Sequence, residues 1–158
     1  MSALVSTYAF ATADLPGLLE AARSKPGAGA DAFRDYFKAH ARPLAVYDGS
    51  GFIFNTVLSL IEEHGIPLMD SDHNAIAEEL QTLRGVLLYL FLTPEHRATS
   101  LDALLSLGMS TEELDDYYED FHERREPGAG EAMADALEFL VGAIDAVPED
   151  GVVLFEMG

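Results

Sequence analysis

Three polar residues at alternate positions are the best candidates for metal binding in this sequence. Asp70, Asp72 and Asn74 occupy positions 1, 3 and 5 of a stretch that could supply oxygen ligands, as a calcium-binding loop does. The rest of that loop is missing, because Ala75 replaces the glycine of position 6 and a glutamine replaces the glutamate of position 12. Residues of these types also cap helices. We therefore expect Asp70, Ser71 or Asp72 to cap the following helix, and we expect neither a metal nor a cofactor.

A second pattern resembles half of a di-iron motif. Glu119 and His122 have the Glu-x-x-His spacing of di-iron bundles, which use two such motifs and two further glutamates. The only similar pair is Asp70 and His73, which lies at the start of an expected helix. Because eight acids lie between residues 112 and 126, a chance match on a solvated helix face is the simpler interpretation.

The turn at residues 48–51 contains two glycines and precedes an expected helix at 52–64. A helix N-terminus of this kind attracts anions, but the lysine of a phosphate-binding loop is absent. A ligand-binding domain or enzyme that uses the loops at 48–51 and 70–74 is the alternative functional hypothesis. These loops flank opposite ends of one helix, about 20 Å apart. That separation argues against a shared site.

The most distinctive expected surface is an acidic helix at residues 111–125. Eight acids and two arginines lie between residues 112 and 126, which gives a net charge of −6. A basic protein could dock on the acids Glu112, Glu113, Asp116, Glu119 and Asp120. The simpler interpretation is a solvated helix face above a normal buried stripe.

The charge of the whole chain restricts its partners. Its 158 residues include 28 acids and 9 lysines and arginines, for a net charge of −19. Such a chain repels nucleic-acid phosphates and anionic membranes, so we expect neither as a partner. The charge suits a basic protein partner, mimicry of a nucleic acid, or a surface that only keeps the protein dispersed.

The absence of cysteine excludes disulfides, thiolate metal sites and a cysteine nucleophile. Residues 1–15 have no basic segment before their apolar residues, so we expect no signal peptide. The longest apolar run, 86–92, is far shorter than the ~20 residues of a membrane span. Together these features favour a cytoplasmic location.

The expected elements are organised around one central helix at residues 74–92. Its apolar residues recur every three or four positions, from Ile76 through Leu80 and Leu83 to Leu87 and beyond. Gly85 interrupts this stretch. The periodicity across the glycine favours a continuous helix, and the alternative is a buried strand at 86–92.

Strands are expected at the two ends of the chain and helices between them. Residues 4–10 and 152–156 have strand patterns, and neither strand is stable alone, so we expect them to pair. Residues 44–47 suggest a short extended piece, and 24–29 break the first helix. Further helices are expected at 15–22, 31–41, 52–64, 111–125 and 131–147. A helix or a pair of turns is expected at 93–107, where Thr93 and Pro94 mark the start and His96 lies in the first turn. The sequence thus predicts one α+β domain over 1–158, mostly helical, with about six helices around helix 74–92 and a small sheet of terminal strands.

The order of these elements resembles the YfbM-like family of small bacterial proteins. The resemblance rests on residues 6–19 (STYAFATADLPGLL), 92–95 (LTPE), 101–107, 110–118 (STEELDDYY) and the closing strand 152–155. The family usually carries a tryptophan and a histidine on its central helix, and the matching residues 87–93 contain neither. The resemblance implies an α+β fold and brings no activity and no catalytic residues.

The first functional hypothesis is therefore a non-enzymatic cytoplasmic protein that acts by binding another protein, as a regulator or an immunity or antagonist protein does. It predicts an acidic patch and no pocket with convergent polar groups. The alternative, a small ligand-binding or enzymatic domain, predicts the loops at 48–51 and 70–74 together at the mouth of a cleft.

Overall fold

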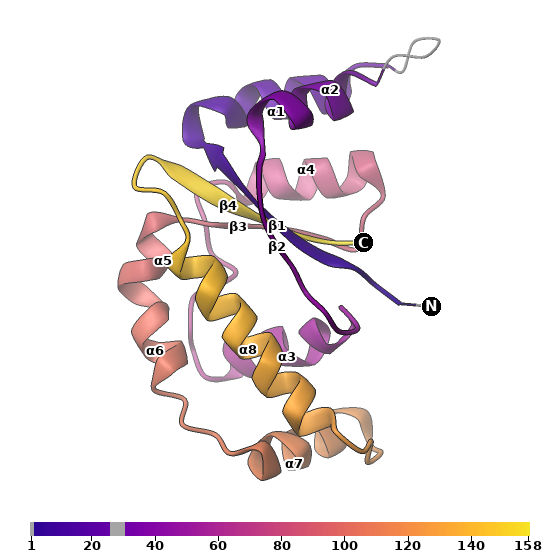
Figure 1. The fold of residues 1–158 in the computed structure, drawn as a ribbon, viewed down its shortest axis with the longest axis vertical. Helices are drawn as coiled ribbons and strands as arrows, with labels where there is room; N and C mark the ends of the chain where they lie inside the picture. The colour runs from indigo at the N-terminus through magenta and orange to yellow at the C-terminus, as the bar shows by residue number, and fades with distance from the viewer. Residues whose placement is uncertain (1, 26–30) are drawn as a thin grey trace.

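An antiparallel four-stranded sheet forms the centre of the molecule in the computed structural model, which describes residues 2–25 and 31–158 (Figure 1). The strand order is β2-β1-β4-β3. The strands are β1 (Val5–Ala11), β2 (Arg42–Val46), β3 (Leu88–Leu92) and β4 (Gly151–Met157). The predicted pairing of the terminal strands is confirmed, because β1 and β4 pair from Val5↔Met157 to Ala11↔Gly151.

Helices cover both faces of the sheet (Figure 1). On one face lie α1 (Leu15–Arg23), which follows a 3-10 turn at Thr12–Asp14, α2 (Ala32–His40) and α4 (Asn74–Arg84). On the other lie α3 (Ile53–Glu63) and α8 (Ala129–Asp145), and against α8 pack α5 (Pro94–Thr99), α6 (Leu101–Leu105) and α7 (Thr111–His122). The fold is α+β and mostly helical, as predicted.

The sheet separates two hydrophobic cores, because successive side chains of a strand point to opposite faces. On β4, Val153 and Phe155 join a core with residues of α3 and α8. Val152 and Leu154 join a second core with residues of α1 and α4. The closing strand thus has apolar residues on both faces, which explains its unbroken apolar pattern.

The predicted central helix at 74–92 is wrong. Helix α4 ends at Arg84, because Gly85 adopts a left-handed conformation (φ +66°) and its N–H donates to the carbonyl of Gln81. Residues Leu88–Leu92 then form β3, which pairs with β4. The sheet, not a helix, is therefore the organising element, and the part of the chain that is described has eight α-helices instead of about six around a central one.

Other expected boundaries differ in smaller ways. The short extended piece expected at 44–47 is β2, a full strand that pairs with β1. The break expected at 24–29 begins after Arg23, and its residues 26–29 lie outside the described chain. Residues 93–107 form two short helices, α5 and α6, and not one helix. Helices α5 and α7 begin where the sequence indicated, and a capping box starts each, at Thr93 and at Ser110.

Candidate functional site

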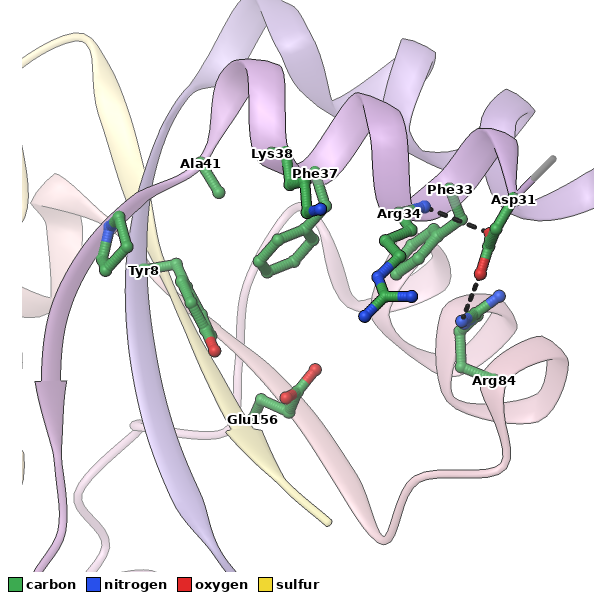
Figure 2. Close-up of a pocket in the computed structure, with 10 residues that line it drawn as sticks. Tyr8, Asp31, Phe33, Arg34, Phe37, Lys38, Ala41, Arg84 and Glu156 are labelled. Atoms are coloured by element: carbon green, nitrogen blue, oxygen red, sulfur yellow. Dashed lines mark hydrogen bonds and ion pairs between the residues drawn. The ribbon is translucent and has the colours of Figure 1, made fainter. Parts of the chain in front are cut away.

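A surface cavity of about 650 Å³ lies between α2, the sheet and the end of α4 (Figure 2). Strands β1, β2 and β4 contribute its floor and one side. The lining residues are Tyr8, Asp31, Phe33, Arg34, Phe37, Lys38, Ala41, Pro43, Arg84 and Glu156. Its volume lies within the range of small-molecule sites.

Aromatic rings form one wall of the cavity. Phe33 and Phe37 are four residues apart on α2, so both project from the same helix face toward the sheet. Tyr8 of β1 meets Phe37 edge to face, with ring centroids 4.7 Å apart, and Phe10 supports Phe37 from the core side at 5.3 Å. Figure 2 shows Tyr8 and Phe37 side by side at the cavity. This packing holds the aromatic wall in place for a planar or apolar ligand.

Cations gather around the same cavity. Of the nine lysines and arginines in the chain, three line it: Arg34, Lys38 and Arg84. Arg34 and Lys38 lie one helical turn apart on α2, and both residues are exposed. Among the residues that the structure describes, neither has an ion-pair partner. A strongly acidic chain therefore places at one cavity two positive charges that form no ion pair within the described residues.

Arg84 is held at the rim by two neighbours. Its guanidinium lies 4.3 Å from the centroid of the Phe33 ring and 3.5 Å from the carboxylate of Asp31. Asp31 is the N-cap of α2 and accepts a hydrogen bond from the backbone N–H of Arg34 at 3.1 Å. This hydrogen bond and the charge of Arg84 hold the pKa of Asp31 below its ordinary value. Asp31 therefore serves the local structure and stays ionised.

Glu156 faces the cavity from the floor. It lies on β4, a central strand, in register with Ser6 of β1 and Tyr89 of β3, and Figure 2 shows its carboxylate pointing into the cavity. Burial raises the pKa of Tyr89, and the neighbouring Glu156 carboxylate raises it further. Glu156 has no ion-pair partner within the described chain. The Glu156 carboxylate is therefore half-buried at the cavity and can accept further hydrogen bonds from a ligand there.

The metal candidate at residues 70–74 forms a hydrogen-bonded turn before α4. Asn74 donates to the carbonyl of Met69 at 3.0 Å, and the N–H of His73 donates to the hydroxyl of Ser71 at 3.0 Å. Within 2–25 and 31–158, no three or more histidines and acids gather as a metal site would require. The prediction that residue 70, 71 or 72 caps α4 is wrong, because the turn puts His73 at the N-cap without a side-chain capping bond.

The loops at 48–51 and 70–74 do not share a cavity. Gly49 and Ser50 line a second cavity of about 760 Å³ with the end of α7 and the start of α8, and residues 70–74 do not line it. The Glu119 and His122 side chains also have separate partners. Glu119 accepts from Arg125 at 2.9 Å, whereas His122 bonds to the hydroxyl of Thr56 at 2.8 Å. Neither pattern therefore forms the site that its spacing suggested.

The five acids proposed for partner binding lie on α7, and some have partners in the chain. Glu113 accepts from the backbone N–H of Ser110 in the capping box. Arg125 pairs with Asp116 at 3.4 Å and with Glu119 at 2.9 Å. The remaining two acids, Glu112 and Asp120, are exposed, and the structure shows no ion pair for either within its described part.

Sequence reasoning missed the cavity beneath α2. Part of its signal was visible, because Phe33, Arg34, Phe37 and Lys38 form two i, i+4 pairs on one short helix. Glu156 was also visible as the only charged residue in the apolar closing strand. The sequence pattern could not predict that these residues meet, because they come from distant segments of the chain.

Comparison with known proteins adds no relative. No family model matches the chain, and no curated protein and no solved structure is significantly similar to it. The resemblance to the YfbM-like family stays a prediction. Among the described helices, none combines the length and apolar character that crossing a membrane requires.

Proposed function

We propose that this protein binds a small organic anion with a planar body in the cavity beneath α2, and that it does so in the cytoplasm. The observation that carries the proposal is the meeting of Arg34, Lys38 and Arg84 at an aromatic cavity in a chain with net charge −19. This proposal keeps the ligand-binding hypothesis but moves its ligand site from the loops at 48–51 and 70–74 to this cavity.

The lining residues divide the work of binding such a ligand. The rings of Phe33, Phe37 and Tyr8 offer an apolar surface for a planar body. The exposed ends of Arg34 and Lys38 offer charge-assisted hydrogen bonds to a carboxylate, sulfonate or phosphate. Because these two cations lack ion pairs in the described part of the chain, an anion would not have to displace a partner.

A fluorescence titration with 8-anilinonaphthalene-1-sulfonate, an aromatic monoanion, tests this proposal. The double variant Arg34→Gln/Lys38→Gln should bind the probe about tenfold more weakly than the wild type, since it loses two charge-assisted contacts. The control variant Arg124→Gln/Arg125→Gln changes the net charge equally at two exposed arginines near α7. It should bind the probe like the wild type. Equal loss in both variants would show that only the overall charge matters and would contradict the proposal.

The acidic surface of α7 supports a second candidate function, the binding of a basic protein. Glu112, Asp116 and Asp120 are exposed, and Phe121 beside them is 45% exposed. An exposed aromatic ring among charges of one sign is typical of a docking surface. The proposed partner is the basic protein expected from the sequence, and not a nucleic acid.

Affinity capture from a native lysate tests the second candidate. A variant with lysine at Glu112, Asp116 and Asp120 should lose a partner that the wild type retains. A control with lysine at the exposed acids Glu20, Asp35 and Glu78 has the same net charge and should retain that partner. A partner that binds both variants equally, or no retained partner, would count against the α7 surface.

A further inference from the structure

The cavity beneath α2 presents opposite charges on opposing walls. Arg34 and Lys38 belong to α2, which forms one wall, and Glu156 belongs to β4 at the floor. Figure 2 shows the Arg34 guanidinium and the Glu156 carboxylate both directed into the space between the helix and the sheet. No ion pair joins Glu156 to either cation in the described structure.

The position of Glu156 is unusual for a carboxylate. It stands on a central strand, with Ser6 and Tyr89 as its cross-strand neighbours and with the apolar Leu154 two residues earlier on the same face. The buried Tyr89 can offer Glu156 one hydroxyl hydrogen bond, which leaves most of the acceptor capacity of the carboxylate unused. On a solvated helix face a glutamate would be surrounded by water, whereas Glu156 is half-buried on the sheet and lines the cavity.

We infer that the ligand is amphoteric, with an acidic group bound by Arg34 and Lys38 and an ammonium or other N–H donor bound by Glu156. This inference rests on the proposed function, because it uses the same cavity and the same anion contacts. It adds a second charged contact, between Glu156 and a cationic group of the ligand. Phe33 and Phe37 share α2 with the two cations, and Tyr8 of β1 packs on Phe37, so the planar body of the ligand would lie against these rings. Aromatic amino acids and related aromatic zwitterions belong to this chemical class.

Three indole compounds that share one ring system provide a matched test. Tryptophan carries both charges, indole-3-propionate lacks the ammonium group, and tryptamine lacks the carboxylate. The chain contains no tryptophan, so indole fluorescence reports on the ligand alone. For the wild-type protein, the Kd of tryptophan should be about tenfold lower than that of either relative, since each relative loses one charge-assisted contact.

A variant of Glu156 tests whether this residue binds the ammonium group of the ligand. Glu156→Gln should raise the Kd of tryptophan about tenfold and leave the Kd of indole-3-propionate unchanged. The control Glu149→Gln removes an exposed carboxylate from the loop before β4 and should leave both constants unchanged. The comparison of the three compounds on the wild-type protein does not depend on how well either variant folds.

The outcomes separate this inference from the proposal on which it rests. If indole-3-propionate binds as tightly as tryptophan, the ligand needs no ammonium group, and the inference is overturned while anion binding stands. If the naphthalene sulfonate binds but no indole compound does, the inference is again overturned and anion binding stands. If tryptamine binds best, or if neither the sulfonate nor any indole compound binds, both proposals fail.

Discussion

His96 is buried at the start of α5, where it takes the place of the usual glutamate or glutamine in a capping box. Its Nδ1 accepts a hydrogen bond from the backbone N–H of Thr93 at 2.9 Å. Its Nε2 lies 2.8 Å from the carbonyl oxygen of Asp70 and donates to it. This network assigns a neutral ring with its proton on Nε2. Burial lowers the pKa of His96 in agreement with this assignment.

The free energy of unfolding should therefore depend on pH through His96. The unfolded chain binds this proton near the ordinary pKa of 6.5, and the folded chain binds it only at lower pH. The contribution of neutral His96 to the free energy of unfolding is complete above pH 6.5. It is lost as the pH falls from there toward the lower pKa of the folded state. His96→Gln keeps a capping acceptor that does not titrate, so it should lose less stability on acidification than the wild type.

Urea unfolding of both proteins between about pH 7.5 and about pH 5.5 measures this difference, because the interval spans the titration of an ordinary histidine. The other four histidines are common to both proteins, so their contributions cancel in the comparison. Equal pH dependence in the two proteins would show that His96 is not held neutral by the fold.

At the scale of residues, the sequence predicted local partners better than distant ones. It placed Thr93 and His96 in the first turn of a helix, because a proline at N1 marks that turn. It did not predict that the carbonyl of Asp70, 26 residues earlier, would accept from His96. Local capping follows from chain geometry, whereas this contact depends on how the turn before α4 packs on α5.

Gly85 decides where helix α4 ends and β3 begins. Its left-handed conformation (φ +66°) closes the helix, and a Cβ added there would meet no atom within 4 Å. A side chain at this position is therefore disfavoured by backbone conformation and not by lack of space. Gly142 is a useful contrast, because it lies within α8, is exposed, and also has no atom within 4 Å of an added Cβ.

Alanine substitutions at these two glycines should have opposite effects on stability. Gly85→Ala should destabilise the protein by about 1 kcal/mol, because an L-residue strains the left-handed conformation. Gly142→Ala should stabilise it by about 0.5–1 kcal/mol, because alanine favours a helix interior. Chemical denaturation measures both changes. If Gly85→Ala also stabilises the protein, α4 continues through residue 85 as a helix.

At the scale of elements, the hydrophobic pattern was ambiguous where α4 meets β3. Leu80 is buried, but Leu83 and Leu87, which continue its helical stripe, are 44% and 51% exposed. Their spacing continued the helical period beyond Gly85 without any packing to support it. A short apolar run such as Leu88–Leu92 suits either a buried strand or a helical turn, and only the pairing with β4 decides between them.

The charge of the whole molecule opposes its folding. The chain carries 28 acids and 9 lysines and arginines, so most carboxylates repel one another without a nearby cation. Raising the ionic strength from about 0.01 M to about 0.15 M shortens the Debye length from about 30 Å to about 8 Å and should raise the Tm. A scan of thermal unfolding in NaCl tests this expectation. A Tm that falls with salt would show that ion pairs outweigh the repulsion.

At the scale of the molecule, the sequence predicted the fold class and the pairing of the terminal strands, because both follow from patterning and from the instability of a lone strand. The candidate site did not follow in the same way. Its residues come from β1, β2, β4, α2 and α4, and the sheet order β2-β1-β4-β3 that brings them together is a property of the tertiary structure.

Mapping of amide chemical shifts by NMR, during titration with 8-anilinonaphthalene-1-sulfonate, tests the central claim most directly, because it locates the bound anion. We expect the largest changes at α2 and at Tyr8, Arg84 and Glu156, which line the cavity from four different elements. The residues around Gly49, at the second cavity, should stay unchanged. Changes gathered at that second cavity, or scattered over the surface, would contradict an anion site beneath α2.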